Sequence, residues 1–224
     1  MMLRVVTFNV HHCEGSDGVV DVGRVGDVIA RAEPDVIALQ ELDRDLPRSG
    51  HTDQASALAR RLDMEVRFFP TLTRGRGEYG IGIGATPRLD DARFVPLPRL
   101  GDEEPRGAIT ATCSGVHVVV AHLSTDRRAR SVQLAALGAI ATGFEGPTVV
   151  MGDLNLGPLS LDPLRRHGFT GPFGHPTLPG RLVKRQIDHI LVSSGITVRR
   201  SWTISTDASD HIPLVAELEV PRPR

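Results

Sequence analysis

The sequence predicts a mixed α/β fold in which two mixed β-sheets pack face to face with helices on the outside. Apolar runs of strand length are interspersed with a few amphipathic helical segments, neither strictly alternating nor segregated, and this pattern favours layered mixed sheets. The stretch from Tyr79 to Val120 lacks helix signals and holds short strands separated by Pro and Gly. The length of 224 residues and the 40% hydrophobic content are enough for one domain, 1–224, with a substantial core.

The amino-terminal third begins as a β-α-β unit. Leu3–Val10 has the apolar run of a buried strand, Val22–Ala32 has helical periodicity, and Asp35–Leu39 forms a second strand that Pro34 introduces. Asp53–Leu62 places its apolar side chains on one helical face, and an extended segment is expected after it, at Met64–Phe69.

The remainder of the chain is mainly strand. Short strands, as in an antiparallel meander, are expected at Tyr79–Gly84, Ala92–Leu97, Gly107–Cys113 and Val116–Ala121. A helix is expected from Arg127 to Thr142, with Thr125 as its N-cap. The last strands are expected at Thr148–Met151, Ile187–Val192, Ile196–Ile204 and Pro213–Val220, and we expect them to complete the fold without an appended domain.

Composition excludes several functional classes. The net charge of −1 gives no general attraction to nucleic acid or to an anionic membrane. No apolar run approaches the ~18 residues of a membrane span, and the first residues lack the features of a secretory signal, so a cytoplasmic protein without stable membrane insertion is expected. No obligate protein partner is evident. Two cysteines are too few for a disulfide scaffold, and a bridge between Cys13 and Cys113 stays open.

Polar residues stand where the predicted buried strands end. A single residue of this kind is more commonly a turn former, a solvated cap or a satisfied buried group. Six such positions together, with carboxylates, histidines and amides, predict an oxygen-rich site with acid-base groups at one rim of the sheets. They are Asn9, Gln40–Glu41, His122, Gly152–Asn155, Asp188 and Ser209–His211.

The types of ligand in this set indicate the metal. Glu41, Asp153, Asp210 and the amide oxygens of Asn9 and Asn155 are hard oxygen donors, which suit Mg²⁺ or Mn²⁺ better than zinc. Such a cation commonly neutralises a phosphate, and the histidines supply a base or a charge stabiliser. The residues therefore predict hydrolysis of a phosphoester.

The order of these motifs resembles the endonuclease/exonuclease/phosphatase superfamily, whose relatives include DNase I-like nucleases, abasic-site endonucleases, sphingomyelinases and inositol-phosphate phosphatases. The resemblance extends from Asn9 to His211. The blocks that are most similar to the small bacterial metal-dependent hydrolases of this superfamily are Thr7–His12, Pro34–Glu41, Arg48–Ser49 and Asp53–Gln54.

The resemblance implies a four-layer α/β sandwich and a metal site. Glu41 would be the principal metal ligand, with Asn9 beside it, and Asp210 would complete the metal side. The implied cofactor is Mg²⁺ or Mn²⁺, and the implied partner is a phosphoester substrate, with nucleic acid among the candidates.

The resemblance also implies roles for five catalytic residues. Asp153 would orient or deprotonate the attacking water, and Asn155 would hold that water or a phosphate oxygen. Asp188 would hydrogen-bond His211, which would contact the phosphate and could serve as the base. His122 would stabilise charge on the phosphoryl group. The sequence leaves open which group is the base.

Substrate contacts are less well defined, because the family pattern is altered here. Tyr79-Gly80 is followed by Ile81-Gly82 where the family often has Asn-Ala, and Ala121 replaces the usual Thr before His122. Tyr79 and Arg106 are the candidate substrate-binding residues. Relatives often have an arginine near the phosphate at the position of Arg106. The alternative for Arg106 is an exposed arginine in a loop.

A few other residues admit two interpretations. His11, His12 and Cys13 resemble part of a zinc site but lack a fourth ligand at a customary spacing, so packing within a loop is preferred, with His11 near the site. Two basic groups could bind phosphate or simply be solvated. One consists of Arg74 and Arg76, and the other of Arg181, Lys184 and Arg185.

The sequence is compatible with a phosphodiesterase, with a hydrolase of smaller phosphoesters and with a binding module. The first is a metal-dependent phosphodiesterase acting on nucleic acid or another phosphodiester. The second keeps the mechanism but takes a small phosphoester or a phospholipid headgroup, and the low aromatic content of 4% is in its favour. The third is a catalytically silent binding module, which predicts loss of one of Glu41, Asp153, Asp188 and His211. All four are present.

Overall fold

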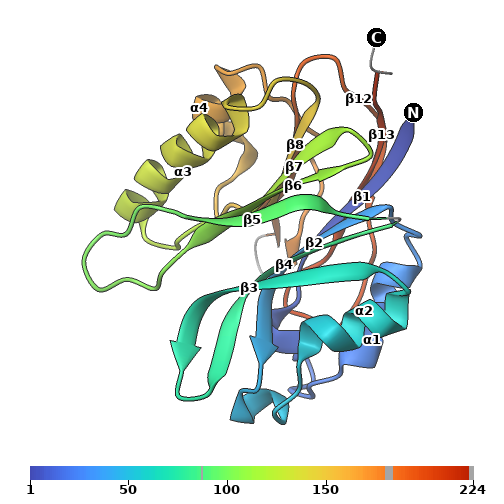
Figure 1. The fold of residues 1–224 in the computed structure, drawn as a ribbon, viewed down its shortest axis with the longest axis vertical. Coiled ribbons are helices and arrows are strands. Elements are labelled where there is room, and N and C mark those ends of the chain that lie inside the picture. The colour runs from blue at the N-terminus through green and yellow to red at the C-terminus, as the bar shows by residue number, and fades with distance from the viewer. Residues whose placement is uncertain (87, 180–183, 222–224) are drawn as a thin grey trace.

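Two β-sheets pack face to face between two pairs of helices, giving four layers (Figure 1). The computed structural model describes residues 1–86, 88–179 and 184–221. Helices α1 (Val22–Ala30) and α2 (Gln54–Leu62) cover the outer face of one sheet, and α3 (Arg127–Thr142) and the short α4 (Asp162–Arg165) cover the outer face of the other. This is the fold class that the sequence predicts.

One sheet has six strands in the order β12-β13-β1-β2-β4-β3. Strands β1 and β2 are parallel, and the other neighbours are antiparallel. Strand β2 is longer than predicted. A bulge follows the expected end at Leu39, and the strand then pairs with β4 again from Leu42 onward. The bounds are β1 Met2–Asn9, β2 Val36–Arg44, β3 Glu65–Arg74, β4 Gly77–Ala85, β12 Thr197–Thr203 and β13 Leu214–Glu219.

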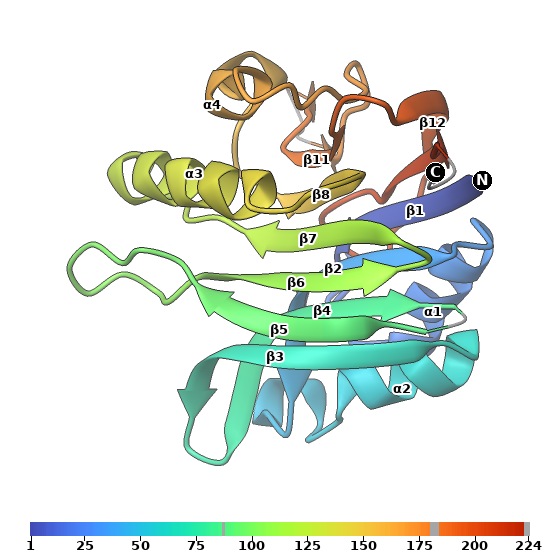
Figure 2. The same ribbon diagram turned by 45° about the horizontal axis from the view of Figure 1, so that its top comes forward.

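The other sheet has five strands in the order β11-β8-β7-β6-β5, with β7 and β8 parallel (Figure 2). The prediction of one meander from Tyr79 to Ala121 is wrong at its start. Strand β4 pairs with β2 and β3, and the chain crosses to the second sheet between β4 and β5. Local sequence shows that a segment is a strand but not which strand pairs with it. The bounds are β5 Asp90–Pro96, β6 Gly107–Cys113, β7 Val116–His122, β8 Thr148–Asp153 and β11 Asp188–Val192.

The shorter elements were not predicted. They are the 3-10 helices η1 (His11–Cys13), η2 (Pro47–Ser49) and η3 (Pro158–Ser160), and the two-stranded pair β9 (Leu178–Pro179) and β10 (Lys184–Arg185). The predicted basic group lies partly here: Lys184 and Arg185 are exposed in β10, and Arg181 lies outside the described residues.

Three apolar cores hold the layers together. Alternate residues of β7 show how: Val118 and Val120 face the core between the sheets, whereas Val119 faces the core beneath α3. A strand that is buried on both faces has a continuous apolar sequence, which explains the three consecutive valines. The third core, which contains Phe8 and Leu58, joins the six-stranded sheet to α1 and α2.

The N-cap of α3 is Asp126, so the prediction of Thr125 is wrong. The Asp126 carboxylate accepts hydrogen bonds from the backbone N–H groups of Arg128 and Ala129, at 2.8 and 2.9 Å. The carbonyl of Thr125 instead accepts a bond from the Arg130 guanidinium. A carboxylate directly before the first helical residue satisfies two free N–H groups at once.

No helix within the described ranges is long and apolar enough to cross a membrane. The two cysteines are free and buried, Cys13 beneath the six-stranded sheet and Cys113 between the sheets.

Candidate active site

The strand register gathers polar residues of the five-stranded sheet at one point. His122, the last residue of β7, pairs with Asp153, the last residue of β8. Asp188, the first residue of β11, pairs with Asp153 from the other side. Gly152 permits this arrangement, because its φ is +144° and a side chain there would collide with the carbonyl oxygen of Ala121.

Asp153 is the centre of the site. Its Oδ2 atom lies 3.1 Å from Nδ2 of Asn9, 3.6 Å from Nε2 of His122 and 3.8 Å from Nε2 of His211. Its Oδ1 accepts a hydrogen bond from the backbone N–H of Asn155 at 2.9 Å. Burial and the neighbouring Asp188 carboxylate raise the pKa of Asp153, against the opposing effect of His211. A carboxylate with a raised pKa is a stronger base.

His211 and Asp188 form a buried pair, in which Nδ1 of His211 lies 2.9 Å from Oδ2 of Asp188. Burial alone would lower the pKa of His211, but the charge and the hydrogen bond of Asp188 outweigh it and raise the pKa above its ordinary value. The Ser209 hydroxyl fixes the loop, because it donates to the backbone carbonyl of Asn9 and accepts from the backbone N–H of His211. The Ser-Asp-His motif therefore connects His211 to the end of β1.

His122 is held from behind by Arg106. The Arg106 guanidinium lies 2.7 Å from Nδ1 of His122 and 3.3 Å from the carboxylate of Glu104, and the arginine side chain is only 11% exposed. The alternative of a solvated loop arginine is therefore wrong. Burial and the charges of Arg106 and His211 lower the pKa of His122 well below its ordinary value. Since Nδ1 faces a permanent donor, the neutral ring carries its proton on Nε2, which faces Asp153 and, at 3.9 Å, Glu41.

Glu41 enters the site from the bulge in β2. Its φ is +63°, a conformation that is unfavourable for a residue with a side chain and that often marks functional sites. The bulge turns the carboxylate toward Asn9, whose Nδ2 donates to Oε1 of Glu41 at 2.8 Å. The amide of Asn9 thus bridges the carboxylates of Glu41 and Asp153, while its oxygen accepts from the backbone N–H of His11.

Two other predicted residues lie at the edges of the cluster. Asn155, whose φ is +52°, donates its side-chain amide to the carbonyl of Leu123 and braces Asp153 through its backbone N–H. Asp210 is 54% exposed, and its carboxylate lies 3.9 Å from Nδ1 of His11. The structure therefore brings Asp210 to the rim of the site rather than into its buried centre.

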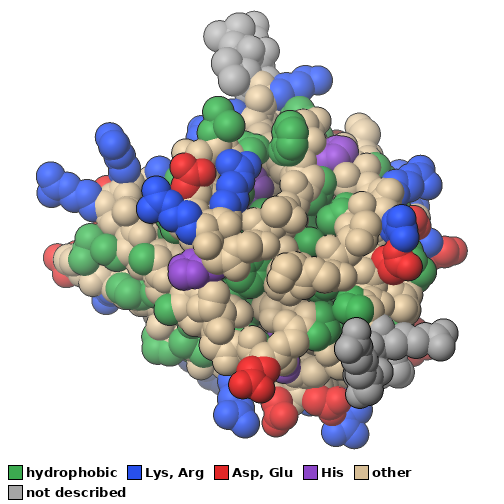
Figure 3. Space-filling model, turned by 90° about the horizontal axis from the view of Figure 1, so that it is seen from above, with side chains coloured by type: hydrophobic (Ala, Val, Ile, Leu, Met, Phe, Trp, Pro, Cys, Tyr) green, Lys and Arg blue, Asp and Glu red, His purple; other side chains and the backbone are tan. Residues whose placement is uncertain are grey.

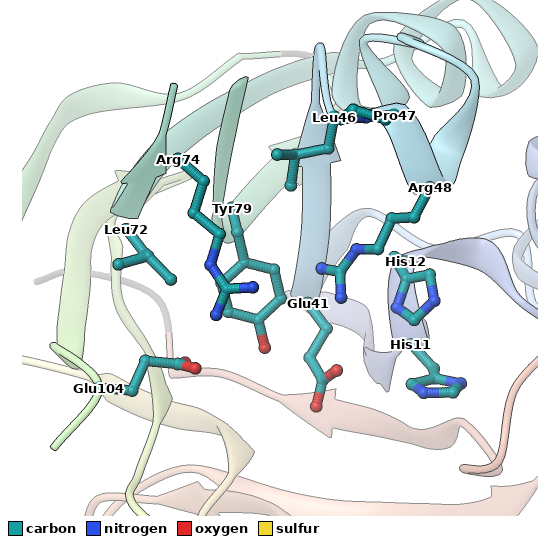
Figure 4. A pocket seen from close by; sticks show the side chains of 10 residues that line it. All are labelled: His11, His12, Glu41, Leu46, Pro47, Arg48, Leu72, Arg74, Tyr79 and Glu104. Atoms are coloured by element: carbon teal, nitrogen blue, oxygen red, sulfur yellow. The ribbon is translucent and has the colours of Figure 1, made fainter. Parts of the chain in front are cut away.

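A pocket of about 500 Å³ opens beside Glu41 (Figure 4). Glu41 stands between Tyr79 on one side and His11 and His12 on the other, and Arg48 lies next to His12. The buried Tyr79 forms part of the wall, and burial together with the Glu41 charge raises the pKa of its phenol, which stays protonated at neutral pH. The remaining lining residues are Leu46, Pro47, Leu72, Arg74 and Glu104.

Local sequence patterns indicate no site role for several groups beside this pocket. Arg48 makes a two-pronged ion pair with the fully buried Asp43, at 2.7 and 2.8 Å. Gln54 accepts from the backbone N–H of Asp43 and donates to the carbonyl of His12. The Arg-Ser and Asp-Gln blocks signalled these residues through family resemblance only.

The residues of the buried cluster fit a bound cation. Asp153, Asp188 and His211 each offer one ligand atom, and these atoms lie within 4.8 Å of one another. Oδ1 of Asp188 is buried and meets no hydrogen-bond partner within the described part of the chain. Two crowded carboxylates and an unsatisfied buried acceptor are features that a positive ion would relieve. These three residues are therefore a possible metal site.

Comparisons with known proteins identify the family and the fold that the chain shares. Residues 6–211 match the model of the Endonuclease/Exonuclease/phosphatase family. The crystal structure of an endonuclease/exonuclease/phosphatase from Beutenbergia cavernae DSM 12333 is 25% identical in sequence, with a TM-score of 0.84, and the match covers 98% of this chain and 72% of that chain. A comparison with curated proteins found no match.

Two more distant structures share the fold. A mannosyl-6-phosphatase from Bacteroides thetaiotaomicron VPI-5482 is 17% identical, with a TM-score of 0.75, and the match covers 97% of this chain and 99% of that chain. The catalytic domain of human Nocturnin, solved with a bound sulfate anion, is 21% identical, with a TM-score of 0.71 and coverage of 98% and 94%.

Proposed function

Because the chain belongs to the endonuclease/exonuclease/phosphatase family, we propose that it is a divalent-metal-dependent enzyme that hydrolyses a phosphodiester by in-line attack of an activated water. The observation that carries this proposal is the geometry around Asp153. Its Oδ2 atom lies within 3.8 Å of nitrogen atoms from Asn9, His122 and His211. A base and several charge-stabilising donors thus converge on one buried point, as phosphoryl transfer to water requires.

The metal would be Mg²⁺ or Mn²⁺, held by Glu41 and Asp210 with Asn9 beside them, and the possible site at Asp153, Asp188 and His211 adjoins it. When bound, the ion would supply positive charge to the phosphate oxygens. Asn9 contributes here mainly as a positioning residue, because its amide nitrogen contacts the carboxylates of both groups.

The other side chains of the site have separate catalytic roles. Asp153 orients or deprotonates the attacking water, and Asn155 holds that carboxylate in place. Asp188 fixes the His211 ring, whose Nε2 faces the phosphate. His122 directs an N–H group at the developing negative charge, and Arg106 fixes its tautomer.

A small phosphoester or a phospholipid headgroup is the second candidate substrate, and the shape of the pocket supports it. The pocket beside Glu41 is of a size that holds a compact ligand, and Tyr79 and Leu72 give it an apolar wall. A strand-tracking nucleic-acid binder usually presents a continuous basic surface, whereas the net charge of −1 gives no general attraction to a polyanion. The face seen in Figure 3 carries both basic and acidic side chains.

Metal dependence is tested with bis-p-nitrophenyl phosphate. We expect hydrolysis by the purified protein with added Mg²⁺ or Mn²⁺, loss of activity in excess EDTA, and recovery when the cation is restored, because the carboxylate cluster needs a counter-charge. Release of p-nitrophenol measures the rate. Activity that persists in excess chelator contradicts the metal assignment.

The residue roles are tested with Asp153→Asn and His211→Ala. Each is expected to lower kcat by about 10²-fold or more, because each removes a group that handles a proton or a developing charge. The exposed Asp102 and His167 provide matched controls as Asp102→Asn and His167→Ala, which should keep wild-type rates. Thermal unfolding of all four variants separates lost chemistry from lost fold, and wild-type turnover by Asp153→Asn contradicts its role.

The substrate is identified by a metal-supplemented screen of DNA, RNA, phospholipids, and sugar and inositol phosphates. Turnover of the small phosphoesters in preference to DNA and RNA would support the second candidate, and the reverse would support the first.

A further inference from the structure

The loop that follows β1 brings two histidines beside Glu41. His11, His12 and Glu41 each offer one ligand atom, and these atoms lie within 4.8 Å of one another. Both histidines have left-handed backbone angles, with φ of +46° and +43°, and Glu41 has φ of +63°. Such conformations are costly for residues with side chains and persist where the surrounding structure imposes them. The three side chains line the same pocket (Figure 4).

His12 is the unusual member of the group. Its side chain is 8% exposed, and its Nε2 lies 3.2 Å from the carboxylate of Glu14. That carboxylate can only accept, so the neutral ring carries its proton on Nε2 and has a lone pair on Nδ1. Nδ1 is buried and, among the residues that the structure describes, meets no hydrogen-bond partner. A buried acceptor without a partner is destabilising unless something else binds it.

A carboxylate that orients a histidine through one ring nitrogen, while the other is free, is a common arrangement around protein-bound metals. Glu14 and His12 reproduce that arrangement. The backbone of His12 is fixed as well, because Gln54 at the start of α2 donates to its carbonyl.

The nearest fixed positive charge does not exclude a cation. Arg48 adjoins His12 in the pocket, but its guanidinium is paired through two nitrogen atoms with Asp43, which is fully buried. Asp43 offsets part of the guanidinium charge, although Arg48 lines the pocket and Asp43 does not. On the other side, the carboxylate of Asp210 lies 3.9 Å from Nδ1 of His11 and adds negative charge.

We infer that His11, His12 and Glu41 form a binding site for a divalent transition-metal ion, with Glu14 as the residue that positions His12. Two imidazole nitrogens and one carboxylate suit Zn²⁺, Co²⁺ or Mn²⁺, whereas Mg²⁺ requires oxygen ligands. The inference rests on the proposed function in one respect, since Glu41 is shared, and it narrows the class of metal that this part of the site accepts.

The test measures metal binding and does not depend on turnover. Metal-free protein is titrated with Co²⁺, followed by visible absorption, and with Zn²⁺ and Mg²⁺, followed by calorimetry. The wild type is expected to bind one Zn²⁺ at this site at least tenfold more tightly than Mg²⁺. His12→Ala should remove that one equivalent of Zn²⁺ and of Co²⁺, leaving any ion at Asp153, Asp188 and His211 in place.

Two further variants make the result decisive. Glu14→Gln leaves both ligands in place and should weaken Zn²⁺ and Co²⁺ binding about 10- to 100-fold, which a merely structural histidine would not show. His51→Ala removes a histidine whose side chain is 64% exposed and should bind as the wild type does. Circular dichroism checks folding, and Glu14→Gln remains informative if His12→Ala fails to fold.

Equal Zn²⁺ and Co²⁺ affinity in wild type, His12→Ala and Glu14→Gln overturns the inference, as does wild-type binding of Mg²⁺ that equals that of Zn²⁺. If the binding results hold but no phosphoester is hydrolysed with any metal, the proposed function fails and the metal site stands. If Mg²⁺ supports hydrolysis by the wild type but the binding results fail, the proposed function stands and the inference fails.

Discussion

At the scale of single residues, the site depends on hydrogen bonds that the sequence could not disclose. The sequence predicts His122 as a charge stabiliser but offers two interpretations of Arg106. The structure joins them, because the Arg106 guanidinium lies 2.7 Å from Nδ1 of His122. The two residues are 16 positions apart and meet only after β6 and β7 pair. No local pattern encodes such a contact.

Arg106→Ala is expected to lower kcat/KM by about 10²-fold, because His122 loses the donor that fixes its tautomer and its N–H no longer faces the phosphate reliably. Rates with bis-p-nitrophenyl phosphate measure the effect. Arg93→Ala, at an arginine that is 76% exposed on β5, is the control. Unchanged kcat/KM in Arg106→Ala would show that His122 needs no such support.

The backbone conformation of Glu41 could not be predicted from the sequence either. The sequence predicts that β2 ends before Gln40, whereas the strand continues to Arg44 through a bulge. Periodicity identifies a strand but does not show an extra residue in it. The prediction of Glu41 as a site residue therefore depended on its chemistry and its place in the motif.

At the scale of elements, apolar periodicity was a good guide. The bounds of α3 and of β6 agree with the prediction because their apolar and polar patterns end at clear turn residues. The sheet to which β4 belongs could not be predicted, since Ile81 and Ile83 would fit the inner face of either sheet.

The capping of α3 gives a prediction at this scale. Asp126→Ala should lower the free energy of unfolding by about 1 kcal/mol, because two backbone N–H groups lose their acceptor. Urea unfolding followed by circular dichroism measures the change. Thr125→Ala is the matched control and should have a much smaller effect; the opposite ranking would restore Thr125 as the cap.

At the scale of the whole molecule, the core between the sheets joins both halves of the chain. It contains Leu218 of one sheet and Ile109 of the other, together with most inward-facing strand residues. We propose on this basis that residues 1–224 form a single cooperative domain. The sequence predicts the apolar strands that build this core, but the pairing of the two sheets is a property of the folded chain.

Ile109→Ala tests that proposal. The residue is fully buried, so its truncation should cost about 2–5 kcal/mol. The single Trp, Trp202, lies on β12 in the opposite sheet, and its fluorescence transition in urea should shift by the same amount as the circular dichroism transition. Val132→Ala on the exposed side of α3 is the control. Two separate transitions would divide the chain into independent units.

The hydrogen bond between Asn9 and Asp153 joins the two sheets, so it depends on the position of one sheet relative to the other. A slip of ~1 Å between the sheets would break it while every strand stayed paired, and misplacement of that size can cost ~10²-fold in rate. On gradual warming, catalysis should accordingly fade several degrees before the secondary structure melts. Loss of activity would then report the misalignment of the two sheets at a lower temperature than circular dichroism reports unfolding.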